Sequence, residues 1–221
     1  SGCGKSTLGR LALGLERPDS GAVRFKGRDV REIKGKDWRY FRRNVQVVFQ
    51  NFIGAVNPRL SAGDIVAEPL RHFEALDGKR LTARVAELLE MVGLSAADAR
   101  KRPAAFSGGQ LQRVCIARAM ALGPEVLVLD EAVSSLDMLV QAQVMELLAR
   151  LGRERGTSCL FISHDLRVVA RLCSRVAVMK GGVIVEQAAC VEGGIGLRGD
   201  GFAELSEAIL PARPARRACG G

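Results

Sequence analysis

The first seven residues, Ser-Gly-Cys-Gly-Lys-Ser-Thr, have the composition of a loop that binds phosphate. They match the second half of the pattern G-x-x-x-x-G-K-[ST], with Gly4, Lys5 and Ser6 in its last three places. In such a loop, backbone N–H groups surround phosphate oxygens, the lysine ammonium neutralises phosphate charge, and the serine hydroxyl can ligate Mg²⁺. We therefore expect the phosphates of a nucleoside triphosphate to bind at Ser1, Gly2, Cys3, Gly4, Lys5, Ser6 and Thr7.

The first glycine of this pattern, and the buried strand that precedes such a loop, would lie before Ser1. We therefore expect the sequence to be N-terminally truncated. The alternative interpretation of the segment is a glycine turn that happens to carry Lys-Ser. Leu8, Leu11, Ala12 and Leu15 recur at helical spacing and predict a helix directly after the loop, which weakens that alternative.

Two acidic residues follow an uninterrupted apolar run. Val126–Leu129 is typical of a parallel strand buried on both faces, and Asp130 and Glu131 come directly after it. Ligands of open α/β sheets gather at the carboxyl ends of the strands. There Asp130 can hold Mg²⁺ together with Ser6, and Glu131 can act as general base toward an attacking water. The alternative, an acidic pair that only ends a strand, is weakened by the phosphate-binding loop in the same chain.

A second candidate anion-binding segment is Ser107-Gly108-Gly109-Gln110. The serine can cap a helix that begins at the glycines, so that backbone N–H groups and the helix dipole face an anion. One nucleotide does not need two such segments from one subunit. We infer a dimer in which each segment serves the nucleotide of the partner.

The elements that must position these residues are those of an α/β fold with a largely parallel sheet. Apolar runs predict buried parallel strands, and helical spacing predicts a crossover helix between two of them. The predicted strands are Val45–Phe49, Val126–Leu129, Cys159–Ile162 and Val176–Met179, and the predicted helices are 64–102 in several pieces, 107–122 and 139–155. Short hairpins are expected at 22–27 and 181–185, and a flexible tail at 211–221.

Composition disfavours several classes of function. The net charge is +9, but aromatic residues make up only 5%, so no platform for stacking bases and no nucleic-acid partner is expected. The six cysteines form no C-x-x-C pair and predict free, mostly buried thiols in a reducing compartment. Cysteines and the two histidines lack metal-ligand spacing, so we expect no transition-metal site. No apolar stretch reaches the roughly 20 residues that span a bilayer.

With these residues in place, the sequence resembles the ABC transporter ATPases from Ser1 to about Glu186. Phe106-Ser-Gly-Gly-Gln-Leu-Gln-Arg is similar to the family signature, with Phe106 where leucine is commonest. Gln50 matches the Q-loop glutamine, Ser134-Ser135-Leu136-Asp137 the D-loop, and His164 the switch histidine. The resemblance implies a P-loop NTPase core of mainly parallel strands, an antiparallel β subdomain and a helical subdomain that carries the signature.

The resemblance also implies roles for individual residues. Two ATP molecules would be sandwiched between two subunits, with Mg²⁺ at Ser6, Gln50 and Asp130. The catalytic residues would be Glu131 as base, His164 holding the γ-phosphate and water, and Gln50 reporting nucleotide state to the membrane subunit. The implied nucleotide contacts are residues 1–7 and Asp130 of one subunit, with Ser107, Gly108, Gly109, Gln110 and Asp137 at the dimer interface.

A finer resemblance is to the peptide/nickel importer branch of this family, and within it to the second ATPase subunit of nickel importers. It is carried by residues 48–59, 107–115, 129–134, 159–167 and 209–217, with Ala132-Val133 in place of the usual Pro-Thr. It implies ATP hydrolysis that energises nickel import at the cytoplasmic face of a bacterial inner membrane. The implied partners are a second, different ATPase subunit, two permeases and, indirectly, a periplasmic binding protein, and no direct nickel site is expected on this chain.

Residues 1–190 are expected to form the nucleotide-binding domain, with the helical subdomain at about 60–122, and residues 191–221 a partly flexible C-terminal extension. Three alternatives to nickel import remain open. The first is the same role in an importer of di- or oligopeptides. The second is a soluble ABC ATPase acting on DNA or ribosomes, which is disfavoured because no coiled coil and only one signature are present. The third is a nucleotide-binding regulator that does not hydrolyse, which Glu131 and His164 argue against.

Overall fold

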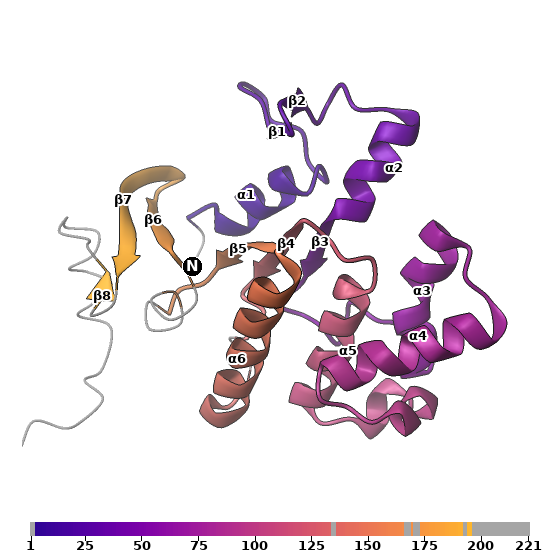
Figure 1. Ribbon diagram of the computed structural model, residues 1–221. Helices are drawn as coiled ribbons and strands as arrows, with labels where there is room; N and C mark the ends of the chain where they lie inside the picture. Colours follow the sequence, from indigo (N-terminus) through magenta and orange to yellow (C-terminus); the bar gives the residue numbers. More distant parts are fainter. Residues whose placement is uncertain (1–2, 134–135, 166–168, 170–172, 192–193, 196–221) are drawn as a thin grey trace, which may run out of the picture. The chain divides into compact units, whose positions relative to one another are not determined.

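The computed structural model describes residues 3–133, 136–165, 169, 173–191 and 194–195. It divides into two compact units, residues 5–164 and residues 1–4 with 165–221, which are described separately (Figure 1). No helix within the described ranges combines the length and apolar character needed to cross a bilayer.

The larger unit is built on a three-stranded parallel sheet. Its strands are β3 (Val45–Val48), β4 (Val126–Asp130) and β5 (Ser158–Ile162), in the order β3-β4-β5. The predicted strands at these three places are confirmed, as is the crossover helix, α6 (Met138–Arg155). β4 is the central strand, and Leu127, Val128 and Leu129 are at most 1% exposed, because neighbours and helices cover both its edges and its faces.

Helix α1 (Lys5–Ala12) begins at Lys5, the lysine of the predicted phosphate-binding loop, and contacts β4 and β5. Gly9 allows this close approach, since a Cβ there would lie 2.8 Å from Cδ1 of Ile162. The helix ends earlier than the apolar spacing predicted, and Leu15 lies beyond it and is exposed. The position of α1 on the sheet therefore determines where Lys5 and Ser6 lie.

A short hairpin and a polar helix follow α1. The strands β1 (Arg24–Phe25) and β2 (Arg28–Asp29) pair antiparallel around Lys26 and Gly27, as predicted. Both turn residues have positive φ, at 49° and 82°, as a two-residue type I′ turn requires. Helix α2 (Gly35–Asn44), which was not predicted, packs Phe41 into the apolar cluster beside β3 and β4.

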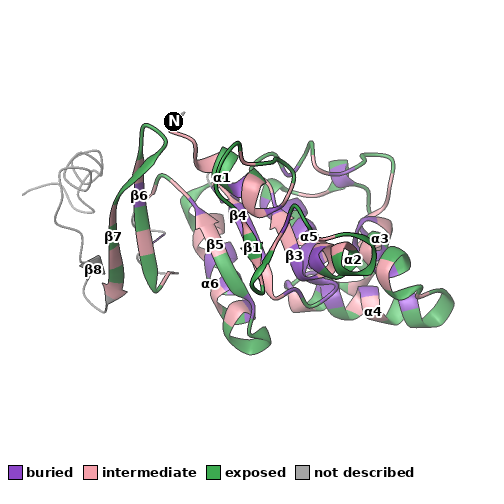
Figure 2. Cartoon of the chain, turned by 90° about the horizontal axis from the view of Figure 1, so that it is seen from above, coloured by how far each residue is buried: buried purple, intermediate pink, exposed green. Residues whose placement is uncertain are grey.

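The connection from β3 to β4 is helical. It contains α3 (Ala62–Glu74), α4 (Gly78–Met91), the 3₁₀ turns η1 (Ala96–Arg100) and η2 (Pro103–Ala105), and α5 (Gly108–Met120). The predicted helices between 64 and 122 are therefore present, with breaks between them. Their core includes Ile65, Leu70, Leu88, Leu89 and Ile116, each at most 1% exposed. Figure 2 shows that α5 is largely buried whereas α4 presents one face to solvent.

In the smaller unit, β6 (Arg175–Lys180) and β7 (Val183–Val191) form an antiparallel hairpin, and β7 also pairs with β8 (Gly194–Ile195). The hairpin at Gly181-Gly182 is confirmed, but the prediction that Val176–Met179 is a buried parallel strand is wrong. The two-residue turn forces antiparallel pairing, and only Val178 in this strand is buried. A short apolar run does not by itself distinguish the two environments.

Among the described residues, five cysteines lie outside any disulfide, as predicted. Of these five, only Cys115 is buried, whereas Cys159 is exposed and Cys3, Cys173 and Cys190 are partly buried. The expectation of mostly buried thiols is therefore wrong for the described cysteines. Cys219 and the predicted tail at 211–221 lie outside the described residues.

Candidate active site

Ser6 and Asp130 meet although they are 124 residues apart in the sequence. Ser6 lies in the first turn of α1 and Asp130 is the last residue of β4. The Ser6 hydroxyl donates a hydrogen bond to Oδ1 of Asp130 at 3.2 Å in a partly buried setting. Lys5, the preceding residue in α1, is partly buried as well. The packing of α1 on the sheet thus brings a lysine, a hydroxyl and a carboxylate to one end of β4.

Glu131 contacts residues that follow both neighbouring strands. Its Oε2 accepts a hydrogen bond from Nε2 of Gln50 at 3.0 Å, and its Oε1 lies 3.6 Å from Nδ1 of His164. Gln50 follows β3 and His164 follows β5, so the parallel strand order places the three side chains at one edge of the sheet. The Glu131 side chain is 20% exposed and that of His164 is 62% exposed, so a molecule in solvent can reach both.

The backbone of Glu131 is held in an uncommon conformation. Its φ is +47°, in the left-handed region that residues with a Cβ seldom occupy, and its N–H donates to the carbonyl of Ile162 at 2.9 Å. That hydrogen bond continues the ladder between β4 and β5 by one residue. Such conformations persist only where the surroundings hold them, and they cluster at functional sites.

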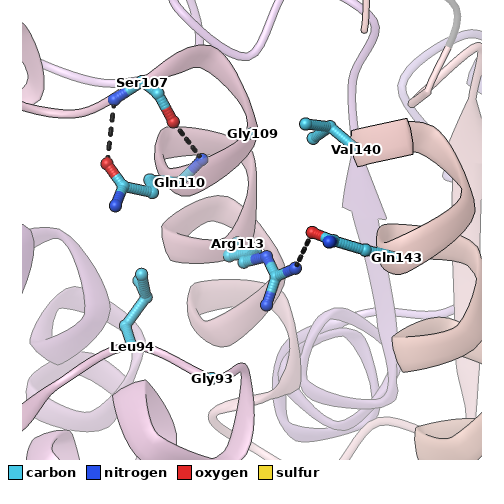
Figure 3. Close-up of a pocket in the computed structure, with 8 residues that line it drawn as sticks. All are labelled: Gly93, Leu94, Ser107, Gly109, Gln110, Arg113, Val140 and Gln143. Atoms are coloured by element: carbon cyan, nitrogen blue, oxygen red, sulfur yellow. Dashed lines mark hydrogen bonds between the residues drawn. The ribbon is translucent and has the colours of Figure 1, made fainter. Parts of the chain in front are cut away.

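The segment Ser107–Gln110 forms the capped start of α5. The Ser107 hydroxyl accepts from the Gln110 N–H at 3.3 Å, and the Gln110 side chain accepts from the Ser107 N–H at 3.0 Å (Figure 3). This reciprocal arrangement is a capping box. The serine cap was predicted, and the return hydrogen bond to the Gln110 side chain was not. A pocket of about 260 Å³ opens beside the segment, between α5 and α6.

Asp137 caps the next helix along this surface. Its Oδ1 accepts a hydrogen bond from the N–H of Val140 at 3.0 Å, which starts α6. Leu136, its neighbour, lies 3.8 Å from the position of a Cβ on Gly108. The predicted D-loop and signature segments therefore contact each other within one chain.

The outcome for the other predicted residues at the start of the chain and in the D-loop differs from residue to residue. Ser1, Gly2, Ser134 and Ser135 lie outside the described residues. Cys3 and Gly4 belong to the smaller unit, where the Cys3 carbonyl accepts from the N–H of Gly182 at 3.1 Å. Thr7 lies in α1, and its hydroxyl accepts from Arg10 at 3.4 Å.

Arg113 was missed as a candidate although it stands in the quoted signature. Its guanidinium donates to the Val92 carbonyl at 3.0 Å and to Oε1 of Gln143 at 3.1 Å, so it joins α5 to the end of α4 and to α6. Its position in the sequence could have identified it, because a residue four positions after Gly109 lies on the same face of the helix.

The donor atoms suit a hard cation rather than a transition metal. Mg²⁺ takes oxygen ligands, keeps several waters, and needs only one or two protein carboxylates when it binds with phosphates. The Ser6 hydroxyl and the Asp130 carboxylate fit that requirement. Among the described residues, no group of three or more His, Cys, Asp or Glu side chains could hold a metal ion by itself.

Comparison with known proteins agrees with this geometry. The ABC transporter family matches residues 1–134. The chain is 53% identical to the nickel import ATP-binding protein NikE of Rhodospirillum rubrum over 220 residues, which cover 100% of this chain and 79% of that protein. It is 49% identical to the nickel import ATP-binding protein NikE of Escherichia coli O157:H7 over 217 residues, covering 98% and 81%.

Solved structures give the same assignment. The ATP-binding cassette MJ0796, in a dimeric post-hydrolysis state bound to ADP and Pi, superposes with a TM-score of 0.76 at 30% identity, covering 86% of this chain and 82% of that one. The protein cbiO1 of Clostridium perfringens, part of the ABC transporter complex cbiONQ, gives 0.75 at 29% identity, covering 85% and 73%. The fold is that of a P-loop NTPase cassette, as predicted, and the chain belongs to the ABC transporter family.

Proposed function

We propose that this chain hydrolyses ATP and that the hydrolysis energises the import of nickel ions through a membrane transporter. The observation that carries the proposal is the placement of the Glu131 carboxylate between Gln50 and His164, at the strand end that also holds the Ser6–Asp130 contact. A carboxylate with two polar neighbours, next to a phosphate-binding helix start, suits attack of water on a terminal phosphate.

The substrate phosphates would bind at Lys5 and Ser6, where the start of α1 adds the positive end of a helix dipole. Mg²⁺ would be held by Ser6 and Asp130, with the amide oxygen of Gln50 as a further ligand. When bound, this cation neutralises charge on the phosphate oxygens. Lys5 would supply the second positive charge to the same oxygens.

The attacking water would be oriented at Glu131. The carboxylate would accept a proton from the water as the oxygen bonds to the γ-phosphorus and the bond to the β-phosphate oxygen breaks. Gln50 and His164 would keep the carboxylate in place, and His164 would also donate to the γ-phosphate. Nucleotide-dependent changes at Gln50 would then report to a membrane subunit.

Each site would be completed by a second ATPase subunit. Ser107, Gly108, Gly109 and Gln110 of one subunit would approach the nucleotide bound to the other, with Asp137 beside them at the interface. The dimeric form of the relative that holds ADP and Pi supports this arrangement. ATP would favour the closed dimer because its γ-phosphate contacts exist only there, and hydrolysis would release it.

Nickel as the cargo is supported by the relatives at 53% and 49% identity, which are nickel import ATP-binding proteins. The proposed partners are a different ATPase subunit, two permeases and, through them, a periplasmic binding protein. The proposed location is the cytoplasmic face of a bacterial inner membrane. The cation itself would pass through the permeases, since the energising subunit does not need to touch it.

Reconstitution of the complete complex in proteoliposomes tests the cargo. Uptake of radiolabelled Ni²⁺ that requires ATP, and does not occur with labelled di- or oligopeptides, is the expected result. ATP-driven uptake of peptide without nickel would instead identify a peptide importer. Glu131→Gln provides the control, because it should retain assembly but abolish uptake.

A separate measurement distinguishes the soluble alternative. The full-length protein, purified from its own cells, should copurify with membranes and a permease. Copurification with nucleic acid or ribosomes instead would overturn the transporter assignment and leave the ATPase assignment intact.

A further inference from the structure

Gly109 leaves space that is filled by a side chain of α6. A Cβ at Gly109 would lie 2.2 Å from Cγ1 of Val140, more than 1 Å closer than ordinary van der Waals contact at 3.4 Å. Gly109 itself is buried, and Val140 points toward it (Figure 3). The glycine is therefore required by packing inside one chain, independently of any approach to a nucleotide.

Val140 cannot easily yield this space. A valine in a helix has one strongly preferred χ1 rotamer, so moving Cγ1 away requires rotation out of that well or movement of the helix. The backbone of Val140 is also held, because its N–H donates to Asp137 at the helix start. One residue thus contacts the signature segment with its side chain and the proposed D-loop with its backbone.

A second contact one turn further along repeats this connection. Arg113 of α5 donates to Oε1 of Gln143 of α6 at 3.1 Å, and it also donates to the carbonyl of Val92. Gly109 and Arg113 are four residues apart, and Val140 and Gln143 three, so the two pairs lie on facing sides of the two helices (Figure 3). We call these four residues the α5–α6 contact.

We propose that Val140 is a positioning residue, which fixes Ser107–Gln110 and Asp137 relative to each other so that both reach the nucleotide interface as one unit. This proposal rests on the proposed ATPase function. The two segments come from different helices and from positions about 30 residues apart in the sequence, so packing must set their relative position. A displacement of about 1 Å at a catalytic site can lower a rate by roughly a hundredfold.

A double-mutant cycle on the full-length protein in its assembled complex tests the proposal. Gly109→Ala should lower kcat for ATP by roughly a hundredfold, with a smaller change in the KM for ATP because the proposed phosphate contacts at Lys5 and Ser6 are untouched. Adding Val140→Ala removes Cγ1 and leaves Cβ of residue 140 at 3.6 Å from the new methyl group, an ordinary contact. The double variant should therefore recover at least about tenfold of the lost activity, because it relieves a displacement of about 1 Å.

Val144→Ala is the matched control, because Val144 is a buried valine one turn further along α6. Combined with Gly109→Ala, it should restore nothing. If Gly109→Ala/Val140→Ala is as inactive as Gly109→Ala alone, the close approach of Gly109 to nucleotide explains its requirement and the proposal is wrong. Full activity of Gly109→Ala would also overturn it.

Thermal unfolding of the same variants separates this proposal from the ATPase assignment. Gly109→Ala should lower Tm by roughly 3–10 °C, and Val140→Ala in that background should restore most of it. If the wild-type complex hydrolyses no ATP, the proposed function fails, and positioning of an active site fails with it. If the complex is active but neither kcat nor Tm is restored, only the role of Val140 fails.

Discussion

Replacing Glu131 with glutamine tests the proposed chemistry most directly. The substitution keeps the shape of the side chain and one oxygen that can accept the hydrogen bond from Nε2 of Gln50, now 3.0 Å long. It removes the negative charge and the ability to accept a proton from water. The left-handed backbone at this residue is unchanged, because both side chains carry the same Cβ. Binding of ATP should therefore survive while turnover does not.

The expected loss follows from the role of a general base. Such a group contributes typically about 10²–10⁴ in rate, which corresponds to about 2.7–5.4 kcal/mol of barrier. A loss of this size in kcat, with little change in the KM for ATP, is expected from steady-state ATPase measurements on the assembled complex. Because we propose that hydrolysis releases the closed dimer, the variant should also accumulate as an ATP-bound dimer, which gel filtration can detect.

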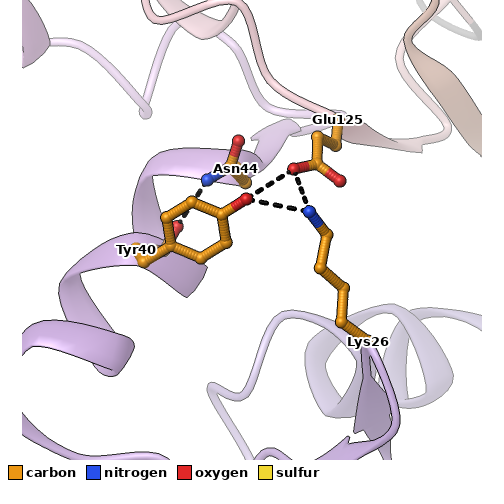
Figure 4. A network of polar contacts seen from close by, with 4 residues as sticks. All are labelled: Lys26, Tyr40, Asn44 and Glu125. Atoms are coloured by element: carbon orange, nitrogen blue, oxygen red, sulfur yellow. Dashed lines mark hydrogen bonds and ion pairs between the residues drawn. The ribbon is translucent and has the colours of Figure 1, made fainter.

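Glu125 offers a matched control for the same chemical change. It immediately precedes β4, whereas Glu131 immediately follows it. Its carboxylate accepts from Nζ of Lys26 at 2.6 Å and from the hydroxyl of Tyr40 at 2.8 Å (Figure 4). Glu125→Gln should leave kcat within about twofold of wild type, since exposed ion pairs contribute little. Comparable losses in both variants, or full activity of Glu131→Gln, would refute the assignment of Glu131 as base.

Three further predictions concern packing and ionisation. Gly9→Ala should lower the free energy of unfolding in urea by about 1–3 kcal/mol. Ile162→Val in the same chain should restore part of this loss, because it removes the Cδ1 that lies 2.8 Å from the new methyl group. If the double variant lost the sum of the two single losses, the reasoning would be contradicted. Gln112→Met should raise Tm, because Gln112 is 0% exposed and its amide atoms have no hydrogen-bond partner among the described residues. The control Gln46→Met should lower Tm, because it removes the hydrogen bond that Gln46 donates to the carbonyl of Arg42. Burial raises the pKa of the Cys115 thiol from 9.0 to about 11, so the protonated thiol stabilises the fold below pH 9, and this contribution is lost between pH 9 and about 11. Cys115→Ala should therefore reduce the fall in the free energy of unfolding over this pH range. An equal fall in both proteins would exclude the effect.

The chemistry-bearing residues were predictable to different degrees. Asp130 and Glu131 follow a long apolar run, and such a run marks a central strand whose carboxyl end faces ligands. Gln50 and His164 carry no comparable local signal. Their proximity to Glu131 depends on the strand order β3-β4-β5, which arises from contacts between distant segments. Only resemblance to a family could connect them before the fold was known.

Local pattern also failed where tertiary contacts decide the structure. Helix α2 has the sequence Gly-Lys-Asp-Trp-Arg-Tyr-Phe-Arg-Arg-Asn, and only Phe41 and Asn44 are buried in it. Most of its positions are polar or charged, and the helix is held by Phe41 in the core cluster. The contact between Gly109 and Val140 was likewise unpredictable, because spacing along each helix does not reveal which helices meet.

Gln50, Glu131 and His164 meet because each lies only one or two residues beyond the end of its strand. Leu129 pairs in register with Val48 on one side and Phe161 on the other, so the neighbouring strands end at nearly the same level. Gln50 and His164 each lie two residues beyond their strands, and Glu131 lies one residue beyond β4. Because consecutive Cα atoms are about 3.8 Å apart, a change of one residue in either short connection would displace Gln50 or His164 from Glu131 by up to that distance. The strands would remain intact, so the site depends on this spacing as much as on residue type.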